Sequence, residues 1–144
     1  MTAHAGLIAL RLGGAWQGVL IQGPSGAGKS DLALRAITQG FRLVADDRTI
    51  LFQSAGRLFG RAPASLHGLI EVRGVGILSV DALPLARIVL SVRCGPDRSL
   101  IERLPEPASQ RLHGVEVPTL DLWPFDHSAP AKIGRAIEHL GARR

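Results

Sequence analysis

One run of eight residues restricts the fold of this chain more than any other feature of its sequence. The pattern G-x-x-x-x-G-K-[ST] occurs as Gly23-Pro24-Ser25-Gly26-Ala27-Gly28-Lys29-Ser30, between a buried-strand segment, Gly18–Gln22, and a run of helix formers, Asp31–Gln39, that stops before Gly40. Glycines in such a strand–loop–helix unit let backbone N–H groups converge on phosphate oxygens, and the positive end of the helix dipole adds to this field. The run therefore predicts a nucleotide-phosphate site, in which Lys29 reaches the β- and γ-phosphates and Ser30 ligates Mg²⁺.

The remaining segments predict many strands and few helices. A last helix is expected from about Ala129 to Leu140, with Ser128 as its N-cap and Ile133 and Ile137 on its apolar face. Glycines 74 and 76 favour a tight backbone over a regular element in 69–79, and prolines favour a loop or short helix over 95–110. Strands are expected at Leu7–Leu12, Gly18–Gln22, Arg42–Ala45, Thr49–Gln53, Arg57–Gly60, Ala86–Arg93 and Val115–Leu122. The expected fold class is α/β: a strand-rich, mixed-sheet P-loop domain with few helices, unlike a nucleoside kinase with strictly alternating strands and helices.

Length and composition narrow the classes of protein further. The 144 residues suit a single domain, 1–144, and 46% apolar with 20% charged residues is typical of a folded globular chain. The net charge of +5 comes from scattered arginines without interleaved aromatics, which does not favour nucleic acid as a partner. No apolar run is long enough for a membrane span, no secretory signal is evident, and the single cysteine, Cys94, fits a reducing compartment. A cytoplasmic location is therefore expected.

Two further groups of polar residues accompany the phosphate loop. Asp46 and Asp47 follow the expected strand 42–45, whose end faces the ligand crevice in an α/β sheet. Adjacent side chains on an extended backbone point to opposite sides, so only one carboxylate would face the phosphates. Glu71 and Arg73 would share one face if their segment is extended. A metal carboxylate and a base are what phosphoryl transfer requires beyond nucleotide binding.

The segments GPSGAGKS, RLVADD and HGLIEVRGVGIL, in this order and spacing, resemble the catalytic domain of HPr kinase/phosphorylase. Enzymes of that bacterial family phosphorylate and dephosphorylate a serine of the phosphocarrier protein HPr, within the regulation of carbohydrate metabolism by the phosphotransferase system. IEVRGVGIL is similar to the family's own signature, which ordinary P-loop kinases lack. The resemblance extends from about His4 to Leu78, and the chain looks like a short proteobacterial form without the family's N-terminal domain.

The resemblance implies a role for each matching residue. Gly23–Ser30 would bind ATP with Lys29 catalytic, and Ser30 and Glu71 would ligate Mg²⁺. Asp47 would be the proton acceptor, and the donor in the reverse reaction, which consumes phosphate and releases pyrophosphate; Asp46 would support it. His4 and Arg103 would match a catalytic histidine and an active-site arginine. The resemblance also implies HPr as protein partner and assembly into hexamers.

One departure from the family leaves the reverse activity less supported than the forward one. Longer members carry an Arg-Pro-Gly-Arg-Asn-like loop important for dephosphorylation, whereas this chain has VPTLDLWPFDHSAPAK in the corresponding region. Two alternatives also stay open at this point: a kinase of small metabolites, and a nucleotide-sensing module without turnover. Asp46, Asp47 and Glu71 argue against a pure sensor, which has no use for a base.

Overall fold

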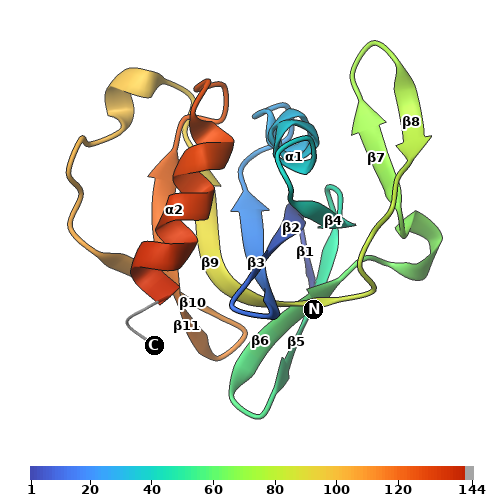
Figure 1. Cartoon of the computed structure of the whole chain (residues 1–144), viewed down its shortest axis with the longest axis horizontal. Coiled ribbons are helices and arrows are strands. Elements are labelled where there is room, and N and C mark those ends of the chain that lie inside the picture. Colours follow the sequence, from blue (N-terminus) through green and yellow to red (C-terminus); the bar gives the residue numbers. More distant parts are fainter. Residues whose placement is uncertain (142–144) are drawn as a thin grey trace.

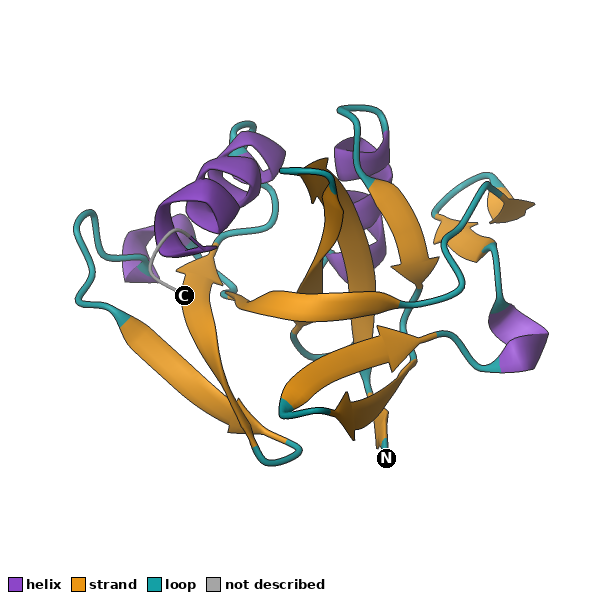
Figure 2. Cartoon of the chain, turned by 60° about the horizontal axis from the view of Figure 1, so that its bottom comes forward, coloured by secondary structure: helices purple, strands orange, loops and turns teal. Residues whose placement is uncertain are grey.

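A strongly bent mixed β-sheet forms the centre of the computed structural model, which describes residues 1–141 (Figures 1 and 2). Its main path runs β1-β5-β6-β9-β3-β2-β4, and β11, paired with β10, also pairs with β9. The strands of this sheet are β1 (Thr2–Ala3), β2 (Ala5–Leu12), β3 (Ala15–Gln22), β4 (Arg42–Ala45), β5 (Thr49–Ser54), β6 (Arg57–Arg61), β9 (Ala86–Cys94), β10 (Ala108–Leu112) and β11 (Val115–Leu122).

Strand β9 connects the parts of this sheet because it pairs with three neighbours. It runs parallel to β3 and to β11 and antiparallel to β6. The remaining pairs along the path, β2 with β3, β2 with β4, β5 with β6 and β1 with β5, are antiparallel. This mixture confirms the strand-rich, mixed-sheet fold class.

Two α-helices, α1 (Lys29–Ile37) and α2 (Ala129–Gly141), occur in the described part, and both cover one face of the sheet (Figure 1). Their apolar residues, such as Leu32 and Ile133, share one buried cluster with Ile8 of β2. The neighbouring Leu7 points to the opposite face, where β5, β6 and β11 close a second cluster. The period-2 alternation of β2 thus separates the two cores. Among residues 1–141, neither helix has the length and apolarity needed to cross a membrane.

Two segments differ from the sequence-based expectation. Residues 69–79, expected to lack regular structure, form an antiparallel hairpin of β7 (Leu69–Val72) and β8 (Gly76–Ser79). The glycines do mark its turn, since Gly74 has φ +84°, but buried Ile70 packs the flanking strand against the helical core. The segment 95–110 holds a short 3₁₀ helix, Arg98–Leu100, and ends inside β10, which the loop prediction missed.

Candidate active site

The phosphate-binding run lies between the end of β3 and the start of α1. The helix begins at Lys29, two residues before the expected start, so that Lys29, Ser30 and Asp31 all belong to its first turn. The free N–H groups of this turn consequently face the loop. Gly28 precedes the helix with φ +100°, in the left-handed region, and a Cβ atom there would lie 2.7 Å from the ring of Phe125. Both the backbone and the close neighbour require glycine at this position.

Lys29 is almost fully buried, with 6% of its surface exposed. Its Nζ donates hydrogen bonds to the carbonyl oxygens of Gly23 at 2.5 Å and Pro24 at 3.1 Å. The ammonium therefore lies inside the loop, where the charge of a bound phosphate group would be. Beneath the loop, burial raises the pKa of the Cys94 thiol to about 11, against an opposing effect of the Lys29 charge, so this cysteine is a protonated core residue at neutral pH.

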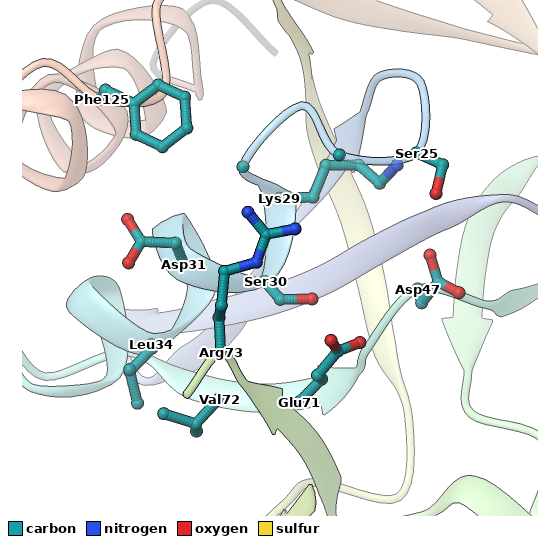
Figure 3. Close-up of a pocket in the computed structure, with 12 residues that line it drawn as sticks. Ser25, Lys29, Ser30, Asp31, Leu34, Asp47, Glu71, Val72, Arg73 and Phe125 are labelled. Atoms are coloured by element: carbon teal, nitrogen blue, oxygen red, sulfur yellow. The ribbon is translucent and has the colours of Figure 1, made fainter. Parts of the chain in front are cut away.

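Asp46 connects the phosphate loop to the β7–β8 hairpin. It accepts a hydrogen bond from Ser30 Oγ at 2.7 Å and a second one from the backbone N–H of Glu71 at 3.0 Å. Because the Ser30 hydroxyl donates to Asp46, its lone pairs remain available to a cation. The Glu71 carboxylate lies on the Ser30 side of the pocket (Figure 3). Two hard oxygen donors thus lie close to the loop, which fits Mg²⁺, an ion that takes few protein ligands and completes its shell with water and phosphate oxygens.

Asp47 faces the pocket, whereas Asp46 is not among its lining residues. The expectation of an extended backbone here is wrong: Asp47 has φ +66°, the left-handed conformation that Asp tolerates better than most residues. The two carboxylates have different partners, since Asp47 Oδ1 lies 3.7 Å from His4 Nε2. Both side chains of this pair are about half exposed, so a substrate group can reach the carboxylate.

Lys29, Ser30, Asp47 and Glu71 line one pocket of about 360 Å³. It is bounded by the loop and first turn of α1, by the acidic end of β4 and by the β7–β8 hairpin (Figure 3). Arg73, from the hairpin turn, extends its guanidinium toward the loop and adds a positive charge to the phosphate side (Figure 3). The lining residues are Ser25, Gly26, Gly28, Lys29, Ser30, Asp31, Leu34, Asp47, Glu71, Val72, Arg73 and Phe125. Among the described residues, no group of three or more His, Cys, Asp or Glu side chains could hold a metal ion by itself.

Sequence reasoning missed the contribution of the segment between β11 and α2. Arg35 of α1 donates hydrogen bonds to the carbonyl oxygens of Pro124 and, at 3.2 Å, Asp126, and it also pairs with Asp31 at 2.9 Å. These bonds hold the segment that carries Phe125, which lines the pocket next to Gly28. No local signal marks Phe125, because nearly a hundred residues separate it from the loop that it contacts.

Arg103 lines a different pocket from the phosphate loop and Asp47. It lies in the exposed segment after the 3₁₀ helix and lines a separate hollow beside Trp123 and Lys132. Its catalytic role therefore stays a prediction from the resemblance, without support from the geometry of this chain.

Comparisons with known proteins agree with this architecture. Residues 3–92 match the sequence profile of the HPr Serine kinase C-terminal domain. An HPr kinase/phosphorylase of Lactiplantibacillus plantarum is 40% identical over 134 residues, which cover 83% of this chain and 39% of the relative. One from Clostridium tetani is 45% identical over 76 residues, or 53% of this chain and 25% of the relative. The chain thus spans less than half the length of these curated relatives.

A solved structure, the Hpr(Ser) kinase/phosphatase from Coxiella burnetii, superposes with a TM-score of 0.83 at 25% sequence identity. The superposition covers 99% of this chain and 92% of that one, and so includes the segments beyond residue 92 that the profile does not match. Since the profile accounts for more than half of the residues and the fold agrees over nearly all of them, this chain belongs to the HPr serine kinase C-terminal domain family.

Proposed function

We propose that this protein is a Mg²⁺- and ATP-dependent protein serine kinase that acts in the cytoplasm on an HPr-type phosphocarrier protein. The observation that carries the proposal is the position of Asp46, which hydrogen-bonds both to Ser30 in the phosphate loop and to the hairpin residue Glu71. The phosphate loop, the candidate metal ligands Ser30 and Glu71 and the half-exposed carboxylate of Asp47 all line one pocket, which supports the proposal. Phosphoryl transfer needs these groups together.

In the forward direction, the chain's residues position the reactants and handle one proton. Gly23–Ser30 bind the phosphates of ATP, and Lys29 neutralises charge on the transferring group. Ser30 and Glu71 would hold Mg²⁺, which would supply further charge neutralisation on the phosphate oxygens. Asp47 accepts the hydroxyl proton of the acceptor serine while the serine oxygen attacks the γ-phosphorus. The bond between the γ-phosphorus and the β–γ bridging oxygen breaks, and ADP is released. His4, 3.7 Å away, orients Asp47.

We propose that the same pocket also performs the reverse, phosphate-dependent reaction. An oxygen of inorganic phosphate attacks the phosphorus of phosphoserine, the serine oxygen leaves, and pyrophosphate forms. Asp47 then returns the proton to the serine oxygen, because one group must serve both directions through the same transition state. Assembly into hexamers, which only the family resemblance implies, belongs to the same proposal and is measurable by sedimentation.

Labelled ATP, Mg²⁺ and purified HPr from the same organism provide the direct test, followed by phosphoamino-acid analysis. Phosphoserine on HPr is the expected product, and addition of inorganic phosphate should then release labelled pyrophosphate. Phosphohistidine, or ATP turnover on a small metabolite without transfer to HPr, would contradict the proposed acceptor. ATP binding without any turnover would indicate a sensor instead of a kinase.

A further inference from the structure

The two ends of the phosphate-loop pocket differ in chemistry. Asp47 and Glu71 lie at one end, where the acceptor would be deprotonated (Figure 3). The opposite end, beside the first turns of α1, is bounded by Phe125 and Leu34, with the side chain of Asp31 between them (Figure 3). Phe125 is the only aromatic residue among the described residues that line the pocket, and 52% of its surface is exposed. A half-exposed aromatic ring at a ligand site can stack against a planar group of the ligand.

The ring of Phe125 is held in place by neighbouring segments of the protein. On one side it lies against Gly28, and Trp123 contacts it edge-on with ring centroids 6.2 Å apart. The backbone is held as well, because Arg35 donates hydrogen bonds to the carbonyl oxygens of the residues before and after Phe125. Asp126 closes the segment by pairing with Lys132 at 2.5 Å and accepting from the Ser128 N–H at 3.0 Å, two contacts that lower the pKa of its carboxyl. A preorganised ring loses little conformational entropy when a ligand stacks on it.

We propose that Phe125, together with Leu34, forms the subsite for the base of the bound nucleotide. The proposal rests on the proposed kinase function, which sets the direction of the ligand. The γ-phosphate must point toward Asp47 for the acceptor to attack it, and the loop binds the neighbouring phosphates. The nucleoside therefore extends the opposite way, along the start of α1, and reaches Phe125 and Leu34. Every nucleobase has a π-face, so an aromatic ring and a branched aliphatic side chain can bind any base. Because such contacts are apolar, this subsite would discriminate little between different bases.

Two ligands that differ only in the nucleoside separate this subsite from the phosphate loop. Dissociation constants for Mg·ATP and for Mg·tripolyphosphate are measured by calorimetry on the full chain and on its Phe125→Ala and Phe125→Trp variants. Phe125→Ala should weaken ATP binding about tenfold, in the range found for loss of one base–aromatic stack. It should leave tripolyphosphate binding within about twofold, and Phe125→Trp should restore ATP binding. Phe52→Ala, in the distant β5–β6 hairpin, is the matched control and should change neither constant (Figure 1).

Each result decides between specific explanations. An equal loss for both ligands in Phe125→Ala would show that the ring acts through the shape of the phosphate loop, and would overturn the base subsite. Unchanged ATP affinity would overturn it as well. If the unsubstituted chain binds neither ligand, the proposed function itself fails, a result distinct from either of these. If thermal unfolding shows that Phe125→Ala does not fold, Phe125→Leu, which keeps apolar contact without a ring, takes its place with the same expected selective loss of ATP affinity.

Discussion

Lys29 is the residue with the most restricted position in the site, since its ammonium is buried and bonded to two carbonyl oxygens of its own loop. The Lys29→Met substitution keeps most of the volume of the side chain and removes its charge. Phosphoryl transfer should fall by about 10²–10³-fold, the loss typical of removing one positioned electrostatic group. Initial rates measure this, with thermal unfolding as the control for folding. Near-normal turnover in a folded variant would mean that Lys29 does not contact the transferring phosphate.

Asp47 and Asp46 should separate into two kinetic phenotypes. Asp47→Asn keeps the shape of the side chain but cannot accept a proton, so the kinase and phosphorylase rates should fall together by about 10²–10⁴-fold with little change in ATP affinity. Asp46→Asn should have the smaller effect on rate and raise the Mg²⁺ concentration required, because it alters the acceptor of the Ser30 hydroxyl. Both variants are assayed in both directions over a Mg²⁺ titration. A larger rate loss at position 46 would assign the base to the other carboxylate.

At the scale of elements, α1 does more than present the phosphate loop, since Arg35 connects it to the segment before α2. Arg35→Ala removes the donors to Pro124 and Asp126 and should lower the free energy of unfolding by about 1–3 kcal/mol. Hydrogen exchange should accelerate in 123–128 and stay unchanged in the β5–β6 hairpin. Denaturant unfolding and exchange mass spectrometry measure the two effects.

Arg135→Ala is the matched control for this substitution. Arg135 lies on α2 and forms an exposed i,i+3 ion pair with Glu138. Its loss should change stability by less than about 0.5 kcal/mol. Equal effects of the two arginine variants would show that Arg35 is a surface residue and does not anchor the segment that carries Phe125.

At the scale of the whole molecule, the contact between β3 and β9 joins the loop-bearing strands to the rest of the sheet. Gly18 lies at a register shift in this pairing, and a Cβ atom there would be 2.4 Å from the backbone oxygen of Arg87. Gly18→Ala should therefore cost about 1–3 kcal/mol, as overpacking of a core typically does. Chemical denaturation measures the loss.

Gly6→Ala, in the neighbouring strand β2, is the control for this prediction. Its Cβ atom would meet Ala45 O at 3.5 Å, an ordinary contact, and the change should be close to neutral. A Gly18→Ala variant as stable as Gly6→Ala would mean that the β3–β9 pairing adjusts freely and does not constrain the sheet.

The sequence alone was sufficient to predict those features of the fold that depend on consecutive residues. The phosphate loop, most strands and the two helices follow from glycine positions, apolar periodicity and helix formers, all of which act through local backbone geometry. The family resemblance was carried by three contiguous segments for the same reason. Strand β10 escaped prediction because its polar residues, at the sheet edge beside β11 alone, show little apolar alternation. The hairpin at 69–79 was not predicted because its glycines indicated a tight backbone, although they lie at the turn between two short strands.

Only the tertiary structure decided how the site is assembled. His4 meets Asp47, Asp46 joins Ser30 to the Glu71 backbone, and Phe125 reaches Gly28. Each of these contacts joins residues far apart in the chain, and depends on the packing of apolar residues of β2, α1 and the hairpin into one core. No local sequence pattern predicts such long-range contacts. The entropy lost in closing the intervening loops is offset by the burial of the whole core, and no single segment provides that burial.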